Sequence, residues 1–205
     1  MLGLPISTEI NKLLPKKAMF DKFKPNAADR KLFDEQISRL TIVAEISPQT
    51  VNITAGADVA SIYVILVTLK TAECHKKNIA LLSKLIDQKM LFILQYGDAA
   101  RLAVYRTENV LMSESKHIDE WKLVLSGFDL GAIWENIIAE VGGIDLTGGK
   151  YLDATIAEKD RREKLHKQIA VLEKKAMNER QPRRKWELAE EVKRLKKELE
   201  DNPNG

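Results

Sequence analysis

The chain has 205 residues, longer than the commonest single domain, which favours one domain with an appended segment. Hydrophobic residues make up 44% and charged residues 31%, enough apolar material for a core, which excludes a wholly disordered chain. Cys74 is the one cysteine, which excludes an intramolecular disulfide framework and a zinc site built on several thiolates. No apolar run approaches the ~20 residues of a membrane-spanning helix, and Met1 does not open a secretory signal. We therefore expect a cytoplasmic protein with no membrane partner.

The first part of the chain shows both helical and strand patterns. Ser7 is placed to cap a short helix over 7–14, and apolar residues at helical spacing predict a firmer helix over 29–40. Alternating residues then predict strands over 41–47 and 49–53. The run 61–70 is β-branched and almost continuously apolar, which is typical of a central strand buried on both faces.

The pattern continues with a predicted helix over 73–88 and a β-hairpin over 90–106, whose turn contains Gly97. A further strand is predicted over 121–125, and a helix over 130–141 begins after Asp129 as its cap. Together these elements predict an α+β domain over 1–145, built on a mostly antiparallel sheet with packed helices.

The glycine-rich stretch 142–150 is predicted to be a linker, because it lacks the Gly-Lys-Ser/Thr sequence of a phosphate-binding loop. Residues 150–205 then carry two apolar seams separated by Pro182, which predicts an antiparallel coiled-coil-like helical hairpin with a basic tip. The alternative is a kinked long helix that pairs with another chain. The seams consist of Leu165, Ile169, Leu172 and Ala176 on one side and Leu188, Val192, Leu195 and Leu199 on the other.

The charge of the chain is segregated. Residues 1–150 are neutral overall, with 18 basic and 18 acidic residues, whereas 159–185 carry 11 basic and 4 acidic residues. The segment that follows, 186–205, is acidic overall. Such segregation is typical of a surface that faces a partner or of charge pairing within the chain.

Two candidate binding sets lie in this region. The first is a DNA-binding set at the predicted tip, because guanidinium groups bridge phosphates and an indole stacks on a base. It comprises Arg180, Arg183, Arg184, Lys185 and Trp186. The alternative is a solvated turn with Trp186 packed on the neighbouring helix. The second set would dock a protein partner, and it comprises Trp186, Leu188, Val192, Leu195 and Leu199.

No catalytic constellation, metal site or cofactor motif is predicted. The three histidines have no metal-ligand spacing, and His75 follows Cys74 directly on a predicted helix, where neighbours point about 100° apart. A restriction-type nuclease needs a carboxylate on one strand and an acid-x-Lys sequence on the next. Asp58 precedes the strand and Lys70 ends it, but Thr68 occupies the acid position. An enzyme is therefore the less favoured alternative.

Three stretches resemble an uncharacterised bacterial family known as a domain of unknown function. They are Leu2-Gly-Leu-Pro-Ile-Ser-Thr-Glu-Ile-Asn-Lys, Leu130-Gly-Ala-Ile-Trp-Glu-Asn-Ile-Ile and Glu179-Arg-Gln-Pro-Arg-Arg-Lys-Trp-Glu-Leu-Ala-Glu. Members of that family are often encoded beside a helicase and a DNA methyltransferase of type III restriction-like systems. The resemblance implies a non-catalytic accessory or adaptor subunit of a restriction-like or phage-defence complex. Its partner would be the helicase or methyltransferase, with contact to DNA and self-association through the hairpin as further options. The competing hypothesis is a divergent metal-dependent nuclease of restriction-endonuclease-like fold.

Overall fold

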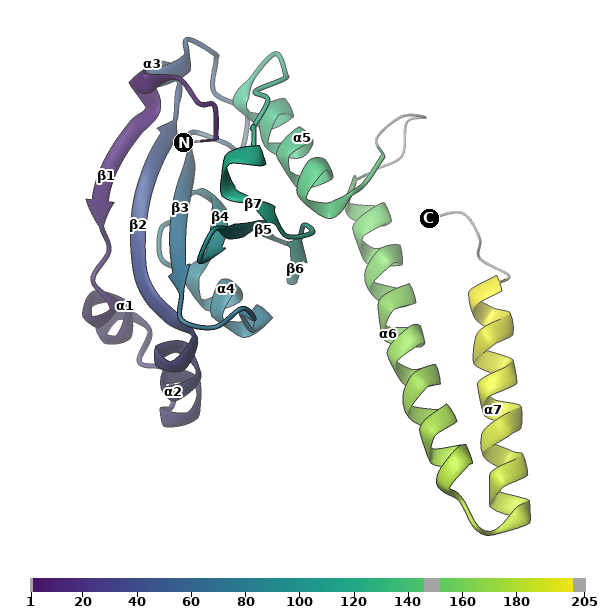
Figure 1. The fold of residues 1–205 in the computed structure, drawn as a ribbon. Helices are drawn as coiled ribbons and strands as arrows, with labels where there is room; N and C mark the ends of the chain where they lie inside the picture. The colour runs from purple at the N-terminus through teal and green to yellow at the C-terminus, as the bar shows by residue number, and fades with distance from the viewer. Residues whose placement is uncertain (1, 146–151, 201–205) are drawn as a thin grey trace. The chain divides into compact units, whose positions relative to one another are not determined.

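The computed structural model describes residues 2–145 and 152–200, which belong to two compact units, 1–145 and 146–205 (Figure 1). The elements of the first unit are η1 (Ile6–Thr8), β1 (Glu9–Leu13), α1 (Lys16–Phe23), α2 (Ala27–Gln36), β2 (Ile37–Ile46), α3 (Pro48–Val51), β3 (Ile62–Leu69), α4 (Lys76–Leu82), β4 (Lys89–Tyr96), β5 (Ala99–Arg106), β6 (Asn109–Met112), β7 (Lys116–His117), η2 (Ile118–Glu120) and α5 (Leu130–Gly142). The second unit consists of α6 (Leu152–Asn178) and α7 (Pro182–Glu200).

The strands form one sheet in the order β1-β2-β3-β4-β5-β6, with β7 paired to β5. The predicted α+β fold with a C-terminal helical pair is confirmed. The sheet is mixed rather than purely antiparallel, because β3 and β4 run parallel. Parallel neighbours need a crossover, and α4 lies in the connection between these two strands.

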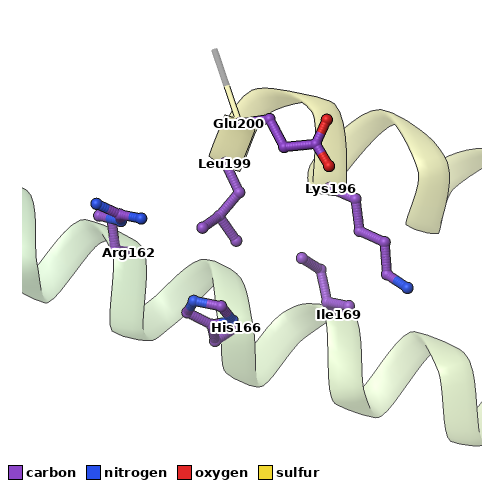
Figure 2. Close-up of a pocket in the computed structure, with 6 residues that line it drawn as sticks. All are labelled: Arg162, His166, Ile169, Lys196, Leu199 and Glu200. Atoms are coloured by element: carbon purple, nitrogen blue, oxygen red, sulfur yellow. The ribbon is translucent and has the colours of Figure 1, made fainter. Parts of the chain in front are cut away.

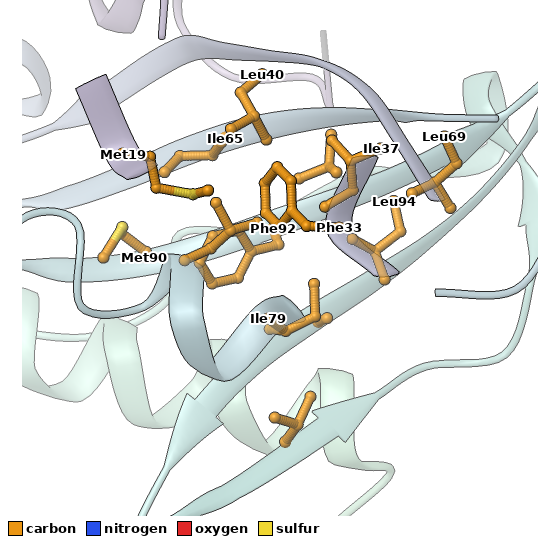
Figure 3. Close-up of a cluster of buried hydrophobic side chains, with 14 of the residues drawn as sticks. Met19, Phe33, Ile37, Leu40, Ile65, Leu69, Ile79, Met90, Phe92 and Leu94 are labelled. Atoms are coloured by element: carbon orange, nitrogen blue, oxygen red, sulfur yellow. The ribbon is translucent and has the colours of Figure 1, made fainter. Parts of the chain in front are cut away.

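The main core lies on one face of the sheet, under α1, α2 and α4 (Figure 3). Alternate residues of β3 and β4 point into it, including Ile65 and Phe92, and both are almost completely buried. Phe33 of α2 packs against Phe20 of α1 with the ring centroids 5.5 Å apart in an edge-on arrangement. All of these side chains belong to the first unit, which therefore has its own hydrophobic core.

Helix α5 covers part of the opposite face. Val110 of β6 belongs to the main core, so its neighbour Leu111 points the other way. A Cβ added at Gly142 of α5 would lie 3.3 Å from the Leu111 Cδ1, which places the end of α5 against that face. Asp129 caps α5 as predicted, accepting the Ala132 N–H at 2.8 Å.

The predicted helix over 29–40 is wrong in its last turn. The helix ends at Gln36 and β2 begins at Ile37 with no loop between them. A β-bulge between Ile37 and Arg39 shifts the strand register, so Ile37 and Leu40 reach the same core although they are three residues apart. This spacing is what a helix would show, and the bulge produces it in a strand.

Two other short segments adopt the opposite structure to the one predicted. Residues 9–13 form a strand rather than a helix, because they pair with β2. Residues 48–51 form a helical turn rather than a strand. Pro48 stands at the first helical position, and Ser47 and Thr50 form a reciprocal capping box there.

Later boundaries also differ from the prediction. Helix α4 is shorter than 73–88, because His75 caps its start and the chain leaves the helix after Leu82. The hairpin over 90–106 is confirmed as β4 and β5. Strand β6 was not predicted, because Thr107 and Glu108 adopt positive φ angles in its two-residue turn, where glycine or asparagine is the usual signal. Residues 121–125 form no strand.

The linker prediction falls largely on residues 146–150, which lie outside the described residues. Gly143 ends α5 in the left-handed conformation, with φ at 58°, as expected for a glycine that terminates a helix. Across the described helices, none combines the length and the apolar character needed to cross a membrane.

We expect a chain truncated after Asp145 to fold by itself, because the main core draws its residues only from the first unit. Thermal unfolding followed by circular dichroism should show one cooperative transition, and limited proteolysis of the full chain should leave a stable N-terminal fragment. A truncated chain without a cooperative transition would mean that residues beyond Asp145 complete the core.

Candidate nucleic-acid interface

The second unit is an antiparallel pair of helices joined by residues 179–181 (Figure 1). Pro182 begins α7 rather than kinking one long helix, and its missing N–H and fixed φ are well tolerated at a first helical position. The Lys185 N–H donates to the Gln181 carbonyl at 2.9 Å and closes the first turn. The kinked-helix alternative is therefore wrong.

The two helices are held together by a short apolar seam. Its buried members are Leu165 and Ile169 of α6 and Val192 and Leu195 of α7, with Leu172 and Leu199 partly buried beside them. These positions follow the 4-3-4 spacing seen in the sequence. The seam therefore binds the helices to each other, and its side chains point inward.

Ion pairs cross between the helices outside the seam. The Arg161 guanidinium lies 3.1 Å from the Glu198 carboxylate, and the Lys196 ammonium lies 2.8 Å from the Glu173 carboxylate. Arg161 also donates to Glu158 on its own helix, which lowers the pKa of that carboxyl. Ion pairs exposed to solvent contribute little to stability, so these pairs act mainly on the register of the two helices.

The tip turn is held by one carboxylate. Glu179 accepts the backbone N–H of Arg180 at 2.8 Å and that of Gln181 at 3.0 Å. The hydrogen bond from Gln181 is the main cause that lowers the pKa of the Glu179 carboxyl. Because hydrogen bonds from backbone N–H groups favour the ionised form, Glu179 stays negative at neutral pH and orders the turn.

All five members of the DNA-binding set lie at this tip and are exposed. The side chain of Arg183 is 93% exposed and pairs with Glu187 at 3.2 Å, and that of Arg184 is 70% exposed and lies 4.0 Å from Glu179. Trp186 is 66% exposed, so it is not packed on α6. The tip thus presents cations and an indole to solvent together.

The set predicted to dock a protein partner contains both buried and exposed residues. Val192 and Leu195 are buried in the seam, and Leu188 and Leu199 are half-buried on the same face. A partner could reach Val192 and Leu195 fully only by opening the helical pair, whereas Leu188 and Leu199 also line surface hollows. Trp186 is the member of that set that stands exposed.

Hollows line both flanks of the helical pair. Figure 2 shows the one near the end of α7, where His166 and Leu199 face each other and Arg162 lies beside them. Two hollows on the other flank adjoin at Val171 and extend to the tip. They include Lys174 and Lys175, which sequence reasoning did not single out although both lie in the basic stretch 159–185.

The first unit does not supply the carboxylates of a restriction-type nuclease at the positions considered. Thr68, at the acid position considered, lies opposite Arg39 in the strand register, so a hydroxyl stands there with a cation across from it. The Lys70 ammonium donates to the Asp34 carbonyl at 2.6 Å, at the end of α2. Within the described residues, no cluster of three or more His, Cys, Asp or Glu side chains could hold a metal ion.

The Cys74–His75 pair forms no dyad in this structure. The His75 Nδ1 accepts the Lys77 N–H at 3.2 Å and caps α4. Burial raises the pKa of the Cys74 thiol to about 11, which keeps it protonated at neutral pH. A thiol in this state is a poor nucleophile.

Comparison with known proteins places the chain in a family. The model of the family described as "Domain of unknown function (DUF4391)" matches residues 2–199, so the chain belongs to that family, and the resemblance seen in the sequence is confirmed at this level. The search of curated proteins and the search of solved structures return no match.

We expect Lys70→Ala to reduce stability rather than remove a catalytic group. The substitution deletes an ammonium that neutralises carbonyls at the end of α2, and the loss should be about 1 kcal/mol. Urea unfolding measures it, with Lys84→Ala as a control, because the Lys84 side chain is also exposed but has no hydrogen bond or ion pair among the described residues. Mg²⁺-dependent plasmid cleavage by the wild-type chain that Lys70→Ala abolishes, with folding intact, would contradict this assignment.

We expect Leu195→Ala to open the helical pair and Trp186→Ala to leave it closed. Truncating a buried leucine costs about 2–5 kcal/mol, which a seam this small cannot absorb, whereas Trp186 stands outside the seam. Far-UV circular dichroism of the full chain should show lost helicity for the first variant alone. Equal losses in both variants would mean that the indole supports the pair.

Proposed function

We propose that this member of the family is a non-catalytic adaptor of a restriction-like or phage-defence complex in the cytoplasm, which contacts DNA through the tip of its helical pair. The observation that carries the proposal is the joint exposure of four cations and Trp186 at one turn. The resemblance noted in the sequence supports the setting, since relatives are often encoded beside a helicase and a DNA methyltransferase. That helicase or methyltransferase is the expected protein partner.

The charges of the tip support nucleic acid as a ligand. Phosphates attract lysine and arginine side chains, and each contact releases condensed counterions, which favours binding at low salt. Arg180 and Lys185 have no ion-pair partner among the described residues, so their charge is available. An exposed indole adds a surface on which bases stack.

The seam is a poor docking surface for a protein partner. Its central leucine and valine side chains are buried between the two helices, and exposing them would cost the contacts that hold the pair together. A helicase or methyltransferase partner would instead meet the outer surface, where Trp186 and Met177 are large exposed apolar side chains near the tip. A second copy of the chain could use the same outer surface.

The nuclease alternative has weaker support. Its chemistry needs two carboxylates to bind Mg²⁺ and a lysine to position the attacking water. Thr68 stands at the acid position with Arg39 opposite it, and the Lys70 ammonium donates to the Asp34 carbonyl. These residues suit a structural role.

Replacing Arg180, Arg183, Arg184 and Lys185 together by Gln should weaken DNA binding, because up to four phosphate contacts are lost. Fluorescence anisotropy of the full chain at several salt concentrations should show the slope of log affinity against log salt flatten by about 0.9 for each lost contact with duplex DNA. The seam is untouched, so helicity should be unchanged.

Absence of DNA binding by the wild-type chain at low salt would overturn the nucleic-acid part of the proposal. The adaptor part is tested separately, by co-purification of the chain with a helicase or DNA methyltransferase of a type III restriction-like system. Complex formation that survives both the tip variant and Trp186→Ala would remove the helical pair from the docking surface.

A further inference from the structure

One flank of the helical pair carries two adjoining hollows, which together are called the groove here. The hollow beside the tip is lined by residues that include Val171, Lys174 and Leu188, and the next hollow also has Val171 in its wall. Together they run along α6 from Lys167 to Asn178. At 1.5 Å per helical residue this is about 16 Å, the length of about five nucleotides of one strand.

The walls of the groove carry more basic than acidic residues. Two acidic residues stand in its walls, Glu179 and Glu191. Both are engaged, since Glu179 accepts the N–H groups of the tip turn and Glu191 lies 2.6 Å from the Arg194 guanidinium. The five basic residues of the walls are Lys167, Lys174, Lys175, Arg184 and Arg194.

Lys174 and Lys175 are the cations with the most available charge. Neither forms an ion pair within the described part of the chain, whereas Lys167 pairs with Glu163 at 2.6 Å. The floor beside them is apolar, formed by Val171 and Leu188, and Val171 is 53% exposed. Free ammonium groups along an apolar floor suit a ligand that bears repeated negative charge and uncharged surface between the charges.

Trp186 lies away from this groove. It precedes Leu188 by two residues, so the two side chains point about 200° apart around α7. Leu188 lines the groove, and the indole therefore stands on the opposite side of the helix. A strand lying in the groove would leave Trp186 free for a different contact.

We infer that this groove, which begins at the tip and continues along α6, holds the phosphodiester backbone of a nucleic acid strand, with Lys174, Lys175 and Arg184 as its main phosphate contacts. The inference rests on the proposed function and deepens it by naming the residues that bind the phosphates. Lysine serves phosphates well as a point charge, and contacts of this kind carry no base specificity. The binding should therefore be indifferent to sequence.

The test compares two variants of the full chain that each remove two positive charges. Lys174→Gln with Lys175→Gln alters the groove, and Arg183→Gln with Lys185→Gln alters the tip outside it. Glutamine keeps helix propensity close to that of lysine and arginine. Anisotropy is measured on a single-stranded oligonucleotide and on a duplex, over about 50 to 200 mM salt.

The groove variant should bind about tenfold more weakly or worse, and its salt slope should flatten by about 1.4 on single strands or about 1.8 on duplex DNA. The tip variant should change the slope by less than half as much. An equal or larger effect of the tip variant would overturn the groove assignment while leaving the proposed function in place. A wild-type chain that binds no nucleic acid would overturn both.

A competition experiment with polyglutamate tests whether the groove binds an acidic polypeptide rather than a nucleic acid. Oligonucleotide should displace bound polyglutamate from the wild-type chain, while polyglutamate at equal charge concentration should not displace oligonucleotide. The reverse order would mean that the groove binds an acidic polypeptide, and the inference would be wrong.

Discussion

The helical pair depends on one narrow seam of apolar side chains. Two helices that face each other can bury one stripe on each, and here that stripe has four buried members. Between Leu165 and Leu199, the side chains outside this stripe and its flanking leucines are small, polar, charged or exposed, because no third layer covers them within the described unit. This constraint explains why the cations and Trp186 are exposed to solvent. It also explains why the seam residues predicted to dock a partner pack between the two helices instead.

The same constraint gives the charges two kinds of role. Arg161 and Lys196 reach across to acids of the other helix and set the register of the pair. Glu179 orders the tip turn through its hydrogen bonds with backbone N–H groups. Lys174 and Lys175 form no ion pair among the described residues. Their ammonium groups lie beside the apolar floor of the groove and are available to an anionic ligand. A count of charges along the chain cannot separate these roles.

In the first unit, lysines close the junction between α2 and β2. This junction has no loop, so the carbonyls at the end of α2 need donors. The Lys70 ammonium donates to the Asp34 carbonyl, its N–H donates to the Gln36 carbonyl, and Lys16 reaches the Ile37 carbonyl. A lysine that resembles part of a catalytic sequence is thereby explained as a cap on a helix end.

The sequence by itself determined the fold class, the β4–β5 hairpin, the capped start of α5 and the seam of the helical pair, because periodicity and capping are local. It missed β6, whose turn lacks glycine, and it misassigned the last turn of α2, where a bulge gives strand residues helical spacing. Only the tertiary structure decided the parallel pairing of β3 with β4 and the direction of each tip side chain. Those features depend on contacts between residues that are far apart in the sequence, and a local pattern carries no information about such contacts.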